Sequence, residues 1–208
     1  MSNVANKQRI ADETLSAIKL DTVLAQKTGV SAVSKPNSYD KTAVITVKKV
    51  GLIGGVQTLI KNNTKINAGV SSFDDKWLPK GETMIINGIT VLGSASDDSA
   101  VDPANAVFGI ANNLIEPALR SAIFRVVQGG VKYEAPIERI APVGTPTSGE
   151  DIYVPLVKPI LLLPETPFNF EIEAALGATP LAGTPGYLKF LFDVTIISTN
   201  NVRQGSAC

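Results

Sequence analysis

The sequence predicts an all-β protein, a β-sandwich, and three features of it carry this prediction. Residues 168–173 alternate between apolar and polar side chains, which is the period of a strand with one buried face. The same alternation returns over residues 188–196, where Leu191 is the one exception. Prolines and glycines separate these and other short runs, and Pro164 and Pro167 break the chain where no central strand could continue.

The charge of the chain is low and balanced. Charged residues make up 18% of its 208 residues, below the roughly 25% of typical soluble domains, and 19 basic residues offset 19 acidic ones. Mean hydropathy is +0.17, so we expect neighbouring molecules to cover part of the surface. Zero net charge argues against a protein that grips phosphates, so we expect no direct nucleic-acid binding.

Two residue types that carry much of enzyme and metal chemistry are scarce. Histidine is absent, which excludes a His-based triad, a His general base and any zinc site that needs imidazole. The single cysteine, Cys208, cannot form an internal disulfide; we expect a solvated thiol, with pairing between subunits as the alternative. We therefore expect no enzyme, with no catalytic residues, no cofactor and no bound metal.

No run of residues approaches the roughly 18 apolar positions that span a bilayer. The first residues also lack the apolar core of a secretion signal. We therefore expect no membrane association and synthesis in the cytoplasm.

Residues 1–30 are predicted to form an N-terminal helical arm, and residues 31–208 the sandwich domain. Between residues 6 and 27 an apolar stripe recurs at helical spacing. A stripe this narrow fits packing on the chain's own sheet or on a neighbouring subunit equally well. The stripe and the single tryptophan, which fits the core or an interface, supply our interface candidates: Ile10, Leu15, Ile18 and Trp77.

The first part of the domain is predicted to hold short strands joined by turns. We expect a polar linker at residues 31–41, a strand at 42–50 and a shorter one at 56–60. Asn87-Gly88 lies between two apolar runs, which predicts a hairpin because both turn residues must tolerate positive φ. The alternative is one long strand with a bulge at Gly88.

The middle of the domain is predicted to change character. Residues 94–102 read as a polar loop, in which Asp97, Asp98 and Asp102 fit a solvated turn better than a calcium loop. We expect a helix from Asp102 to about residue 115, ended by Pro117.

Beyond that helix the strand pattern resumes. Strands at 121–128 and 131–135 are expected to meet in a hairpin at Gly129-Gly130. Residues 136–149 then read as a long exposed connection, and residues 152–157 lead into the C-terminal strands.

The chemical motifs are weak. Gly51, Gly54 and Gly55 lack the spacing of a phosphate-binding loop and indicate a bend. The Ser-x-x-Lys at residues 16–19 and the Lys-Thr-Gly at 27–29 match elements of penicillin-binding enzymes, but no Ser-Asp-Asn accompanies them and chance explains both. Glu171 and Glu173 lie about 7 Å apart on strand geometry, as glycosidase carboxylates can, yet a polar outer face explains them better.

Four stretches together resemble a known family. WLPKGETMIINGITVL, PALRSAIFRVVQGGVKYEAPI, VKPILLLPETPFNFEIE and YLKFLFDVTIIS follow one another as do the strands and loops of jelly-roll structural proteins from bacteriophage particles. The resemblance covers roughly residues 73–198 and rests on the pattern of strands. It implies a jelly-roll sandwich, subunits that associate through their sides, N-terminal arms that tie neighbours together, and no catalytic residues.

The sequence thus favours a structural virion protein that self-associates as part of a phage capsid or its decoration. Its expected partners are other copies of itself, as a homo-oligomer, and other virion proteins; it would be made in the host cytoplasm and reside in the virion. The first alternative is a carbohydrate- or receptor-binding module, since sandwiches present loops suited to recognition. The second is a hydrolase that uses Glu171 and Glu173.

Overall fold

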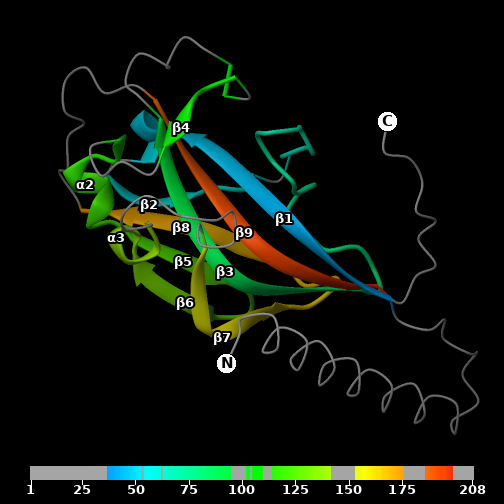
Figure 1. The fold of residues 1–208 in the computed structure, drawn as a ribbon. Helices are drawn as coiled ribbons and strands as arrows, with labels where there is room; N and C mark the ends of the chain where they lie inside the picture. Colours follow the sequence, from blue (N-terminus) through cyan, green and yellow to red (C-terminus); the bar gives the residue numbers. More distant parts are fainter. Residues whose placement is uncertain are drawn as a thin grey trace, which may run out of the picture.

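The protein is an all-β sandwich of two antiparallel sheets (Figure 1). A computed structural model describes residues 37–52, 54–61, 63–94, 102–103, 105–109, 114–141, 153–175 and 186–198. The predicted N-terminal arm and Cys208 lie outside these residues. Within them the elements follow in this order: β1 Asn37–Lys48, η1 Lys49–Leu52, β2 Gly55–Thr58, β3 Glu82–Ser94, β4 Phe108–Gly109, α2 Pro117–Arg120, β5 Ile123–Val127, β6 Val131–Pro136, α3 Ile137–Ile140, β7 Val154–Leu162, β8 Asn169–Ala174 and β9 Tyr187–Ser198.

The first sheet is built on its three long strands. β9 lies between β1 and β3, and β3 then pairs with β7 along its first half and with the two-residue β4 at its end. At one end of the sheet Ser198 is the register partner of both Asn37 and Glu82. The starts of β1 and β3 and the end of β9 therefore meet at one end of the sandwich (Figure 1).

The second sheet has the order β2-β8-β5-β6. Successive strands of the chain pass from one sheet to the other, apart from the β5–β6 hairpin and the small β4. The hairpin predicted at Gly129-Gly130 is confirmed, and both glycines adopt positive φ, at 63° and 142°.

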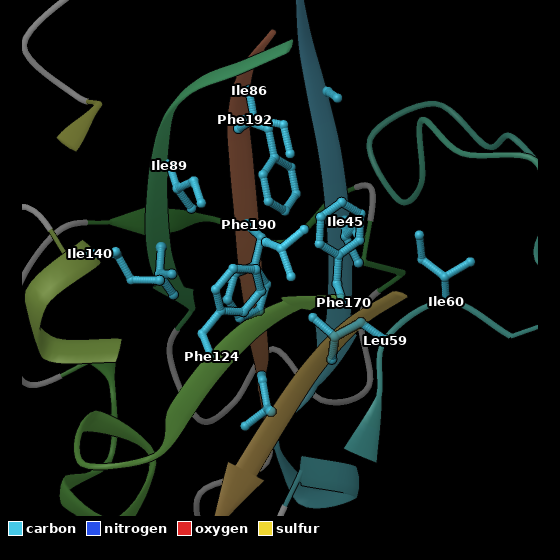
Figure 2. Close-up of a cluster of buried hydrophobic side chains, with 14 of the residues drawn as sticks. Ile45, Leu59, Ile60, Ile86, Ile89, Phe124, Ile140, Phe170, Phe190 and Phe192 are labelled. Atoms are coloured by element: carbon cyan, nitrogen blue, oxygen red, sulfur yellow. The ribbon is translucent and has the colours of Figure 1, made fainter. Parts of the chain in front are cut away.

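Alternation along the strands builds the core between the sheets. β8 points Phe170 and Ile172 inward, and β9 points Phe190 and Phe192 inward, as their period predicts. Phe170 stacks on Phe192 with ring centroids 4.7 Å apart, and Phe124 of β5 stacks on Phe190 at 5.2 Å. Figure 2 shows these rings meeting between the sheets, with Ile45, Ile86 and Ile89 of the first sheet around them.

The hairpin predicted at Asn87-Gly88 is wrong, and the alternative of a bulged strand is confirmed. β3 continues through both residues, and its register with β9 and β7 shifts between Ile86 and Gly88. β3 lies between two partner strands, so its apolar runs on both sides of Asn87 are buried. That burial favours one continuous strand over a turn, which would remove half of it from the sheet.

Two further predictions for the first half of the chain need correction. The polar linker expected up to Lys41 ends earlier, because β1 starts at Asn37 and pairs there with the end of β9. The helix expected from Asp102 to about 115 does not appear in the described part of that segment, where Phe108–Gly109 pair with the end of β3 as β4. In both places pairing with a distant strand overrides the local pattern.

The two short helices also differ from expectation. Pro117 begins α2 instead of ending a helix, which suits a residue whose missing N–H is not needed in a first turn. The segment after Pro136 is not simply exposed, because it starts as α3, whose Ile137 and Ile140 are fully buried in the core.

Candidate functional site: a surface beside strand β7

β7 carries apolar side chains that the core does not use. Val157 is 99% exposed, Leu161 42% and Leu163, one residue beyond the strand, 47%. Lys158 and Glu165, both exposed, lie within the same stretch. These five residues are called the β7 flank below: Val157, Lys158, Leu161, Leu163 and Glu165.

A detour in β7 pushes Val157 out of the sheet. Ile160 pairs with Ile86 and Pro155 with Gly88, so four residues of β7 face the single Asn87 of β3. Pro155 and Pro159 bracket the detour, and neither has an N–H to give to a neighbouring strand. The prolines therefore favour a break in the pairing of β7 with β3 at this point, and Val157 lies in solvent.

The end of β7 is fastened to the other sheet by a buried glutamine. Leu163 N–H donates to Oε1 of Gln128 at 2.8 Å, and Nε2 of Gln128 donates to the carbonyl oxygens of Leu163 and Thr166, both at 3.0 Å. Gln128 follows β5 and is 3% exposed. The three bonds fix the position of the loop that carries Leu163 and Glu165.

Trp77 lies in a loop that is hydrogen-bonded to the loop that carries Leu163 and Glu165. Phe168 N–H donates to the carbonyl of Lys76 at 2.9 Å, and Glu165 N–H to that of Leu78 at 3.3 Å. Trp77, between these two acceptors, is 52% exposed, so of its two predicted settings it takes the surface and not the core. An exposed tryptophan on a fixed loop is available to a partner.

The three other interface candidates, Ile10, Leu15 and Ile18, lie outside the described residues. The β7 flank was missed by the sequence reasoning, although a signal was present. Residues 160–163 are apolar at every position, so a strand there must show apolar side chains on both of its faces.

Glu171 and Glu173 form part of a charge ladder across the outer face of the second sheet. Arg125 of β5 donates from Nε to Glu134 at 2.6 Å and pairs through Nη1 with Glu173 at 2.5 Å. Hydrogen bonds to these two carboxylates raise the pKa of Arg125 above its ordinary value. Glu171 accepts from the Asn169 side chain at 3.0 Å. Both carboxylates thus have partners, Glu173 across the strands and Glu171 within β8.

A buried lysine joins three strand ends. Lys49 is 2% exposed, and its Nζ donates to the carbonyl of Ser94 at 2.7 Å. The Ser94 hydroxyl accepts from Tyr187 N–H at 2.8 Å, and Lys49 N–H donates to the carbonyl of Gly186. These bonds hold together the end of β1, the end of β3 and the start of β9.

Glu116, just before α2, is buried, and neither of its carboxylate oxygens has a hydrogen-bond partner among the described residues. Among the residues that the structure describes, no cluster of three or more acidic or cysteine side chains is arranged to hold a metal ion. In the same part of the chain, no helix is long and apolar enough to cross a membrane.

Comparison with known proteins adds no assignment. The chain matches no family model, and a search of curated proteins finds no significant match.

Proposed function

We propose that the protein is a structural virion protein, a jelly-roll subunit that self-associates in a phage capsid or its decoration. The observation that carries the proposal is the order of the strands. Without β4, eight strands make two four-stranded sheets, β1-β9-β3-β7 and β2-β8-β5-β6. The alternation of successive strands between the sheets supports the jelly-roll arrangement, which wraps eight strands in this way.

The surface supports the second half of the proposal, self-association. Val157, Leu161, Leu163 and Trp77 are large apolar side chains left in solvent, outside the core that the two sheets share. Exposed apolar groups with a tryptophan are typical of contact surfaces. With zero net charge, copies of the chain do not repel one another over a distance.

Light scattering on the purified chain tests self-association. We expect oligomers whose share grows with protein concentration, measured on the full chain and on a variant that lacks residues 1–30. A strict monomer at high concentration, with or without those residues, would overturn the proposal. Electron microscopy of the assembled material then tests whether the oligomers are closed shells.

The alternative of a carbohydrate-binding module has one observation in its favour. Trp77 is half exposed between loops held by hydrogen bonds, and an aromatic ring with one open face can stack on a sugar. A glycan array distinguishes the two functions. Binding that is lost in Trp77→Ala, from a chain that stays monomeric, would favour the module over the shell subunit.

A further inference from the structure

We propose that the β7 flank binds the same flank of a second copy around a two-fold axis, so that Lys158 of each copy meets Glu165 of the other. This inference rests on the proposed self-association and names its surface. It is carried by the exposure of the flank, by the way the β7 edge is closed to strand addition, and by two charges of opposite sign.

The contact must be made by side chains, because the β7 edge cannot accept another strand. Pro155 and Pro159 have no N–H to donate, and prolines on an edge strand block edge-to-edge pairing. At the end of the strand, the N–H and the carbonyl of Leu163 are already bonded to Gln128. What remains available to a partner is the row of exposed side chains.

The two charges of the flank lack partners within the described chain. Neither Lys158 nor Glu165 takes part in an ion pair there, whereas Lys65 and Arg125 do. Lys158 lies three residues before Leu161, and Glu165 four residues after it. An apolar centre with opposite charges at its two ends is complementary to itself when one copy is turned by a half rotation.

This charge pattern favours a second copy over other partners. A nucleic acid or an anionic surface would be attracted by Lys158 but repelled by Glu165, and a basic partner the reverse. A two-fold contact satisfies both charges with the same residues and places Leu161 of each copy near the axis. It also covers Val157, which otherwise leaves a whole apolar side chain in water.

Charge reversal tests the contact. Lys158→Glu and Glu165→Lys each place like charges together at both ends of the contact, so we expect each variant alone to raise the dimer dissociation constant at least about tenfold. The double variant restores both pairs with the signs exchanged, and its dissociation constant should return to within about threefold of the original. Sedimentation at a series of dilutions measures all three, and circular dichroism shows that each variant is folded.

Mixing the two single variants gives the sharpest test. One then carries two acidic residues and the other two basic residues in the flank, so a two-fold contact predicts that the 1:1 mixture forms a heterodimer at concentrations at which each variant alone is mostly monomeric. Leu161→Asp should abolish the dimer of the original chain, because it puts a carboxylate near the axis. Val131→Asp is the matched control, because Val131 is a 59% exposed valine on β6, and it should change nothing.

The outcomes separate the two proposals. A wild-type chain that is monomeric throughout would overturn the proposed self-association and this inference together. A wild-type oligomer that tolerates Lys158→Glu, Glu165→Lys and Leu161→Asp would overturn the inference alone. Loss of the dimer in both single variants without rescue in the mixture would exclude the two-fold arrangement.

Discussion

Gly88 and Gly93 both lie within β3 and not in a turn, and their surroundings differ. A Cβ at Gly88 would come within 3.2 Å of the Cβ of Tyr153, whose hydroxyl hydrogen-bonds that of Thr42 at 2.9 Å. Gly88 of β3 and Thr42 of β1 are both register partners of Asp193 in β9, so the Tyr153 side chain extends across these three strands. A Cβ at Gly93 would instead overlap the backbone carbonyl of Leu114. That Cβ would lie 2.2 Å from the Leu114 oxygen, whereas no contact at Gly88 is shorter than 3.2 Å, so only Gly93 would require a large shift of packed backbone.

Gly93→Ala is therefore expected to destabilise the protein by about 1–3 kcal/mol, the usual cost of overpacking. Urea unfolding followed by far-UV circular dichroism measures this. Gly88→Ala is the matched control in the same strand: its Cβ would lie 3.2 Å from the Tyr153 Cβ and 3.3 Å from the Val154 carbonyl oxygen, so these neighbours need give by only a few tenths of an ångström. Equal midpoints for the two variants would show that the Leu114 backbone does not constrain Gly93.

At the scale of single elements, Gln128 joins β5 of one sheet to the loop beyond β7 of the other. Replacement by alanine would leave the N–H and the carbonyl of Leu163 without these partners. We expect Gln128→Ala to cost about 2–3 kcal/mol, from three lost bonds of about 1 kcal/mol each. The emission of Trp77, in the adjoining loop, should also change in the folded protein. Asn169→Ala removes a half-buried amide of β8, which bonds Thr58 and Glu171 and not the β7 loop, and it serves as the control. The same emission change there would argue against a specific role for Gln128.

The elements also show what sequence reasoning can reach. β8 and β9 were predictable because one face of each is polar, so the period is visible in the sequence itself. β3 was misread because it is buried on both faces, and Asn87-Gly88 then looked like punctuation. In the structure Asn87 donates to the Thr195 hydroxyl at 3.1 Å, a contact 108 positions away along the chain. No pattern in the residues around Asn87 indicates a partner so distant along the chain.

The candidate surface, too, could be predicted from the sequence only in part. Trp77 could be recognised in the sequence because a lone tryptophan is a contact residue whether it is buried or exposed. Lys158 and Glu165 became meaningful only once β7 was shown to be an edge strand whose end is bonded to Gln128. The charge pattern is local, but the exposure that lets it act depends on the tertiary arrangement.

At the scale of the whole molecule, both sheets share one core. Phe170 of the second sheet contacts Phe192 of the first, and also packs against Phe73, Phe124 and Phe168. Neither sheet has a separate hydrophobic cluster of that size among the described residues. The sheets therefore depend on each other for burial, and we expect them to unfold together.

Phe170→Ala tests this dependence, because Phe170 lies at the centre of the shared ring cluster (Figure 2). Loss of a buried phenylalanine lowers the free energy of unfolding by about 3–5 kcal/mol, and this loss should destabilise both sheets equally. Far-UV circular dichroism reports on both sheets and the fluorescence of Trp77, the only tryptophan, on one end of the sandwich. The two signals should keep a single common midpoint that moves to lower denaturant, while Val131→Ala, at a 59% exposed valine outside the proposed contact, stays within about 0.5 kcal/mol of the original. Two separated midpoints in Phe170→Ala would mean that the sheets are stable independently, and the shared core would then not be what holds this fold together.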